Sequence, residues 1–124
     1  LSQVNIGELC IIKSILDSPK RLEMVLDRVD STMFEYHKNE FDMLINDMSN
    51  PSLRGILLND RLELYDDERI NSELRVLLFK FYEKKLIQVK YDTSLQHKEK
   101  ANLIRKVQNN LMQLKRGKLV DYNL

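Results

Sequence analysis

The chain has 124 residues, 43% of them hydrophobic and 31% charged, and its formal net charge is +1. Three Gly, two Pro and no Trp argue against an all-β fold, which needs many turn residues. No apolar run is long enough to span a membrane, no signal peptide is visible, and a single cysteine excludes an intrachain disulfide. We therefore expect one soluble all-α domain, and the start at Leu1 without Met suggests a fragment of a longer protein.

The apolar pattern predicts a helical bundle in the first part of the chain. Residues 3–17 have a wide apolar face at helical spacing. A serine and a proline open the next predicted helix, 18–29, as its cap and first position. Phe34 is expected to anchor the following break in the core. A third helix is predicted at 37–48 and a short fourth helix at 50–58, which an asparagine and a proline begin.

One long helix of about 25 residues is predicted after acidic residues at 66–68, where carboxylates favour a helix start. Its part 72–82 is apolar on nearly every side, as in a buried helix, whereas 83–92 carries a narrow apolar strip among lysines. Thr93 and Gln96 have the spacing of a capping box for the last helix, and Gly117 is well placed to end it.

The last helix is expected to pair with the end of the long helix as an antiparallel hairpin. Its apolar residues recur at steps of three and four, the spacing of a seam with one partner: Ile104, Val107, Leu111 and Leu114. The expected partners are Leu86, Ile87 and Val89. We predict a bundle subdomain at 1–83 and, at 84–124, a protruding hairpin subdomain with a short C-terminal tail. Whether Leu119, Val120, Tyr122 and Leu124 of that tail fold back or are disordered stays open.

The charge changes sign near this boundary. Residues 1–82 carry ten Lys/Arg and fifteen Asp/Glu, a net of −5, whereas residues 83–118 carry ten Lys/Arg and three Asp/Glu, a net of +7. Such a surplus indicates an acidic partner. An acidic protein surface is favoured, because Tyr91 is the one aromatic residue of the hairpin that could stack on a base. A basic helical module that binds single-stranded DNA stays an alternative.

No motif of catalysis or metal binding is present. Cys10 lies on the apolar stripe of the first helix and is interpreted as a small buried hydrophobe. His37 and His97 are far apart and lack further ligands at metal spacing. Phosphate-binding loops, dinucleotide fingerprints and nucleophile elbows are missing. We therefore expect no catalytic residue, no metal and no cofactor within this sequence.

The stretch "GELCIIKSILDSPKRLEMVLDRVDSTMFEYHKNEFDMLIND" resembles the opening of the C-terminal, helicase-binding domain of bacterial DNA primase (DnaG type), with its acid (Glu8), paired apolars, Pro19 and Phe34. The stretch "INSELRVLLFKFYEKKLIQVKYDTSLQHKEKANLIRKVQNNLMQLKRG" resembles the ending of that family. There, a long helix leaves a helical bundle and folds back as a hairpin. The N-terminal domain of the replicative helicase shares the first half and is the alternative, but the basic hairpin favours primase.

The resemblance implies a docking module that binds the N-terminal domain of the hexameric replicative DNA helicase (DnaB type) and modulates helicase activity. It implies a parent enzyme that synthesises RNA primers in the cytoplasm at the replication fork, a DNA-directed RNA polymerase. Zinc and magnesium are implied for the parent only. Weak contact with single-stranded DNA is kept as a further expectation, and no membrane partner is expected. The residues predicted to bind the partner are Lys85, Lys90, Arg105, Leu111, Leu114, Lys115 and Arg116.

Overall fold

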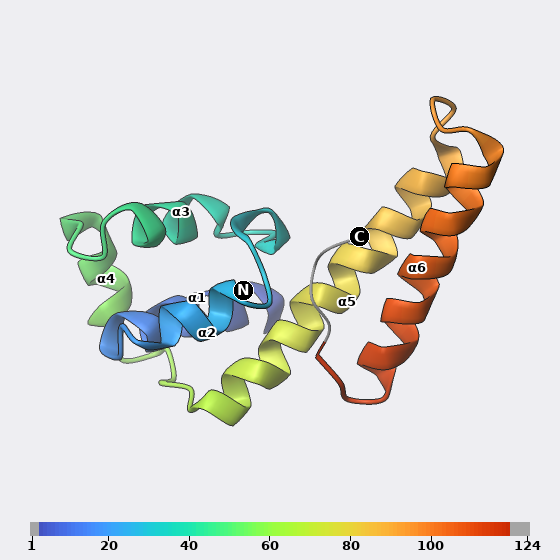
Figure 1. Cartoon of the computed structure of the whole chain (residues 1–124). Helices are drawn as coiled ribbons and strands as arrows, with labels where there is room; N and C mark the ends of the chain where they lie inside the picture. Colours follow the sequence, from blue (N-terminus) through green and yellow to red (C-terminus); the bar gives the residue numbers. More distant parts are fainter. Residues whose placement is uncertain (1–2, 120–124) are drawn as a thin grey trace.

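The computed structural model describes residues 3–119, and the side chains from residue 5 onward (Figure 1). Within that range the chain forms six α-helices and two short 3-10 helices and has no strand, which confirms the predicted all-α class. None of the helices in this part of the chain is long and apolar enough to cross a membrane. The predicted tail residues Val120, Tyr122 and Leu124 lie outside the described range.

The bundle is built around helix α1 (Gln3–Asp17), whose residues Ile11, Ile12 and Ile15 are fully buried. Phe34 stacks on Phe41 with the ring centroids 4.2 Å apart, as expected of an anchor for the break that precedes the third helix. Helices α2 (Arg21–Leu26), α3 (Lys38–Asn46) and α4 (Arg54–Leu57) pack on α1, whereas the 3-10 helices η1 (Ser31–Met33) and η2 (Pro51–Leu53) pack on α3.

Helix α1 has the predicted bounds, whereas the other helices of the bundle are shorter than their sequence patterns indicate. The predicted helix 18–29 starts only at Arg21, because a turn precedes it in which the Ser18 carbonyl accepts from the Arg21 N–H. The predicted helix 50–58 begins as the 3-10 helix η2. Its Asn50 side chain caps this start by accepting from the Ser52 N–H at 2.9 Å.

Three polar side chains of α1 are buried, and each is hydrogen-bonded to the backbone. Glu8 accepts from the segment that leads into α3. Lys13 donates to the carbonyl oxygens of Asn59 at 2.7 Å and Leu62 at 2.9 Å. Ser14 accepts from the N–H of Tyr65 at 2.7 Å. These contacts bind the connecting segments to α1 without leaving a buried polar group unpaired.

Helix α5 (Asp67–Tyr91) runs without a break from the bundle into the hairpin (Figure 1). The Asp66 carboxylate caps it by accepting from the Arg69 N–H at 2.8 Å, so the acidic start is confirmed. Where α5 crosses the bundle, Leu74 and Leu78 are fully buried, as the apolar pattern predicts.

Helix α6 (His97–Lys115) packs antiparallel on α5. Gly117, with φ of 80°, ends it as predicted, and the Lys118 N–H closes the last turn on the Gln113 carbonyl. Arg75 of α5 donates to the Gly117 carbonyl at 3.1 Å, so the pairing extends well below residue 84. The predicted boundary between 83 and 84 falls inside α5, and it stays a prediction.

Two expectations for the hairpin are wrong. Gln96 is the N-cap of α6 but makes no side-chain cap hydrogen bond, so the capping box with Thr93 is absent. The Asp92 carboxylate stabilises the turn between α5 and α6 instead, because it accepts hydrogen bonds from the N–H and the hydroxyl of Ser94. Ile87 is 59% exposed and therefore does not belong to the seam.

Candidate partner-binding surface

The described residues 3–119 offer no group of His, Cys, Asp and Glu side chains that could hold a metal ion. Cys10 is buried, which confirms its interpretation as a small core residue. The ring of His37 lies between Glu40, 2.8 Å from Nδ1, and Asn5, so it ties α1 to α3. The exposed residues of the hairpin are therefore the better candidates for function.

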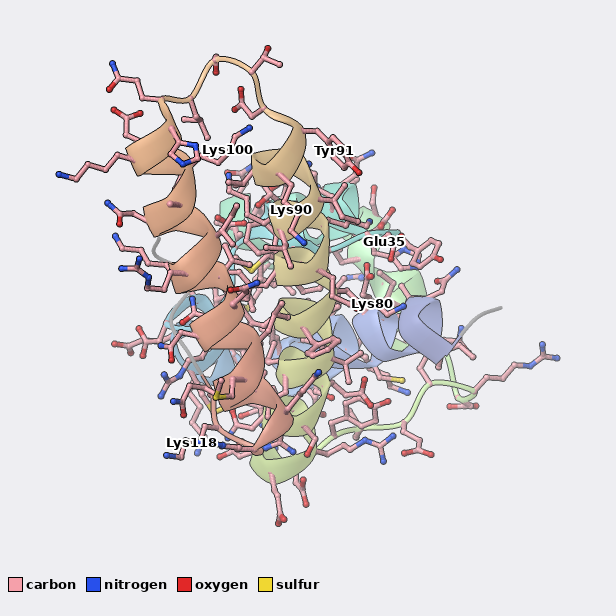
Figure 2. The ribbon with its side chains drawn as sticks, turned by 90° about the vertical axis from the view of Figure 1, so that its right-hand side faces the viewer. Glu35, Lys80, Lys90, Tyr91, Lys100 and Lys118 are labelled. Carbon is pink, nitrogen blue, oxygen red and sulfur yellow. The ribbon has the colours of Figure 1, made fainter. Side chains whose placement is uncertain are left out.

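The outward side of α5 forms the first exposed surface of the hairpin. Val76, Ile87 and Tyr91 are 42%, 59% and 80% exposed. Because a helix turns by about 100° per residue, these positions fall within about 60° of one another. Lys80 and Lys90 are exposed beside them, and Figure 2 shows Tyr91 and Lys80 on the edge of α5 that faces away from α6. We call these five residues the α5 face.

The outward side of α6 forms a second surface, which points away from α5. Its six residues are all exposed and fall within about 40° of one line along the helix. The buried Val107 and Leu114 lie on the opposite side of the helix. We call the second surface the α6 face, and its residues are Lys98, Asn102, Arg105, Asn109, Met112 and Arg116.

Within residues 5–119, whose side chains the structure describes, the positive charge of the hairpin is almost entirely unpaired. Of its ten basic residues, Lys84 alone forms an ion pair within the described part of the chain, with Glu35 of the bundle at 3.1 Å. The pKa of the Asp92 carboxyl at the tip is lowered, first by hydrogen bonds from Ser94 and then by nearby lysine charges. The predicted basic hairpin thus presents its charge to solvent, where an acidic partner could neutralise it.

The charged residues predicted to bind a partner do not lie on one surface. Lys90 lies on the α5 face, whereas Arg105 and Arg116 lie on the α6 face. Lys85, also on α5, is half-buried and belongs to neither face. A role in binding stays a prediction for these four residues and for Lys115, but the four could not all contact one small surface at once.

The apolar residues predicted to bind the partner, Leu111 and Leu114, lie at the seam, and a role for them in binding stays a prediction. Leu114 is 6% exposed, and Leu111 is half-buried and packs against the same core. Lys115 lies 5.9 Å from the centre of the Phe79 ring. Beside these residues, a groove of about 590 Å³ between α5 and the end of α6 reaches Val76. It extends the apolar part of the α5 face toward the base of the hairpin.

Sequence reasoning missed Val76, Lys80, Ile87 and Tyr91 as candidates for binding. The apolar pattern predicts Val76 as core and Ile87 as seam, because apolar spacing alone does not show in which direction each side chain points. Leu86 is half-buried in the seam, and Ile87 is turned by about 100° from it. Plotting the residues around the helix axis would have placed Ile87 and Tyr91 together.

The family model of the DnaG-primase C-terminal, helicase-binding domain matches residues 5–121. A DNA primase of Helicobacter pylori strain 26695 is 30% identical over 114 residues, which are 91% of this chain, and a DNA primase of strain J99 is 28% identical over 114 residues. The chain spans about a fifth, 20%, of the length of these relatives. The crystal structure of the Helicobacter pylori DnaG primase C-terminal domain superposes with a TM-score of 0.82 at 26% identity, covering 99% of this chain and 100% of that one.

Proposed function

Because the chain belongs to the family of DnaG-primase C-terminal, helicase-binding domains, we propose that it docks a primase onto the N-terminal domain of a hexameric replicative helicase of DnaB type. The family match and the primase relatives support this assignment over the alternative, the N-terminal domain of the helicase itself. We further propose that the parent protein makes RNA primers at the replication fork in the cytoplasm, with zinc and magnesium held outside this sequence.

The observation that carries the proposal is the exposure of large apolar side chains on the α5 face. Ile87 and Tyr91 lie one turn apart on a rigid helix and are 59% and 80% exposed. Residues that dominate binding energy are often aromatic and fill pockets on the partner, surrounded by contacts that exclude water. Lys80 and Lys90 flank the apolar pair, so an acidic rim on the helicase would complement them and speed association.

Docking of this kind raises the effective concentration of primase beside the helicase, without any new catalytic group in this domain. The hairpin would supply the main contact. The bundle packs against α5 through its core, so it would be brought to the N-terminal domain of the helicase together with the hairpin, and there it would modulate helicase activity.

The test is the affinity of the chain for the purified helicase N-terminal domain. The variant Ile87→Ser/Tyr91→Ser should bind about 30-fold more weakly or worse, since truncation of dominant interface residues costs ~2 kcal/mol or more. Leu58→Ser/Leu64→Ser is the matched control: Leu58 is 73% and Leu64 54% exposed on the bundle. The control should bind like the unaltered chain, and circular dichroism should show both variants folded.

Two results would contradict different parts of the proposal. If the unaltered chain does not bind the helicase domain, the docking function itself is wrong. If it binds and the Ile87→Ser/Tyr91→Ser variant keeps its affinity, docking stands but does not use the α5 face. An equal loss in the bundle control would show that the effect is not specific to this surface.

A further inference from the structure

The α6 face differs chemically from the α5 face, although both belong to one hairpin. It carries three cations and two amides along its length and one apolar side chain, Met112, which is 48% exposed. Glu99 is the one carboxylate in α6, and it lies about 100° around the helix from Lys98. The α6 face is therefore a stripe of three positive charges and further hydrogen-bond donors, and it contains no acidic residue.

Among the described residues, the cations of this stripe have no ion-pair partner. Lys98, Arg105 and Arg116 have no carboxylate within ion-pair distance in the described part of the chain. All three are exposed, and they follow the straight axis of α6. A ligand that binds them would not have to break an existing contact or move a helix.

This composition does not suit the centre of a protein interface. Interface centres are depleted of charged residues and enriched in large aromatic or apolar ones, which are found on the α5 face instead. Arg, Lys and Asn side chains are, in contrast, the groups that contact phosphate oxygens and sugars in nucleic-acid complexes. We propose that the α6 face binds the phosphate backbone of single-stranded nucleic acid.

The straight course of the stripe favours a single strand over a duplex. From Lys98 to Arg116 the stripe is about 27 Å long at ~1.5 Å per residue. A flexible single strand can follow this line, whereas the phosphates of a duplex curve away from a straight helix after a short contact. The stripe has no aromatic residue for stacking, so binding is electrostatic, independent of sequence and steeply dependent on salt.

The probe is a fluorescently labelled oligothymidylate, titrated with the chain at several salt concentrations. If three phosphates are neutralised, affinity should fall roughly 20-fold between 50 and 200 mM salt. The reason is that the slope of log K against the logarithm of the salt concentration is about −0.7 per phosphate on single strands. The variant Lys98→Gln/Arg105→Gln/Arg116→Gln should reduce the steepness of that slope by about two and weaken binding at low salt about tenfold or more.

The matched control removes three exposed cations from the bundle, as Lys20→Gln/Arg54→Gln/Arg61→Gln, so that net charge falls equally. It should leave the slope unchanged. An equal loss in this control would overturn the proposal in favour of a general charge effect. No measurable binding of the oligonucleotide by the unaltered chain at 50 mM salt would also overturn it.

Two further arms separate other ligands. A duplex of the same length that binds more tightly than the single strand would overturn the choice of a single strand. The α6 variant should retain its affinity for the helicase N-terminal domain. If it loses that affinity and keeps the oligonucleotide, the α6 face belongs to the protein interface instead.

Discussion

The carboxylate of Glu8 accepts a hydrogen bond from the backbone N–H of His37 at 2.9 Å. The same fully buried carboxylate accepts from the N–H groups of Glu35 and Tyr36, each at 3.0 Å. One side chain of α1 thus pairs three successive backbone donors where the chain enters α3. Water cannot easily replace the Glu8 carboxylate, because that side chain is buried. Glu8, the acidic residue of the family pattern, therefore has a structural role.

Replacing this carboxylate should destabilise the fold strongly. Glu8→Ala is expected to lower the free energy of unfolding by about 3 kcal/mol, because three partly buried backbone donors would lose their acceptor at a cost of ~1 kcal/mol each. Urea denaturation at neutral pH measures the change. Glu83→Ala removes an exposed carboxylate from α5 and should change stability by no more than about 0.5 kcal/mol. Similar effects of the two substitutions would contradict this account of Glu8.

Two glycines should respond in opposite directions to the same substitution. Gly117→Ala is expected to destabilise the chain by about 1 kcal/mol, because φ of 80° is unfavourable for a residue with a Cβ atom. Gly55→Ala, in α4, should stabilise it by about 0.5 kcal/mol, since no atom lies within 4 Å of the added Cβ and alanine favours a helix. Thermal unfolding compares the two variants. A shift of the same sign in both would contradict the prediction.

Stability should decrease at alkaline pH because of Tyr65. Burial raises the pKa of this phenol above its ordinary value, and a hydrogen bond with Cys10 adds to the shift. Because the pKa of Tyr65 is higher in the folded state, its contribution to stability is complete at pH values below the pKa of the unfolded state, which is about 10. This contribution is lost as the pH rises toward the pKa of the folded state. The difference in unfolding free energy between the unaltered chain and Tyr65→Phe should therefore stay constant from pH 7 to 9 and shrink at pH 11. A constant difference at pH 11 would contradict this assignment.

The hairpin should be less stable at its tip than at its base. In α6, Val107 and Leu114 are buried, whereas Leu103 and Ile104 nearer the tip are only half-buried. Amides near residue 101 should therefore exchange hydrogen about tenfold faster than those near residue 111, a difference of ~1.4 kcal/mol in the free energy of opening. Native-state hydrogen exchange measures the gradient. Uniform protection along α6 would show that the hairpin opens as one unit.

The sequence predicted the positions of the helices because their apolar periodicity is strong. It did not predict the cap of α6 or which apolar side chains of the hairpin point outward. The core positions Leu74 and Leu78 and the α5 cap at Asp66 follow directly from pattern and charge. The Thr93 capping box failed because Asp92 competes for the same turn through Ser94. Local hydrogen bonds of this kind depend on the conformation of the turn, which spacing alone does not determine.

The candidate surface was predicted only in part, for a related reason. Net charge identified the hairpin, because counting requires no knowledge of direction. Choosing the residues of one face requires the register of α5 against α6, which tertiary packing determines. Leu111 and Leu114 share a helix with Arg105 but point to its opposite side, so grouping them by proximity in sequence mixed seam with surface.

Helix α5 contains no Gly or Pro between residues 67 and 91 and is roughly 37 Å long at ~1.5 Å per residue. A continuous helix of this kind moves as one rigid unit, and it contacts α1 where it crosses the bundle. A small rotation of α5 at this crossing would move Tyr91 farther than residues near the crossing, and the ion pair between Lys84 and Glu35 is one contact between the helix and the bundle. A force applied by a partner at the hairpin tip would therefore rotate the whole bundle, since no flexible linker separates the bundle from the hairpin.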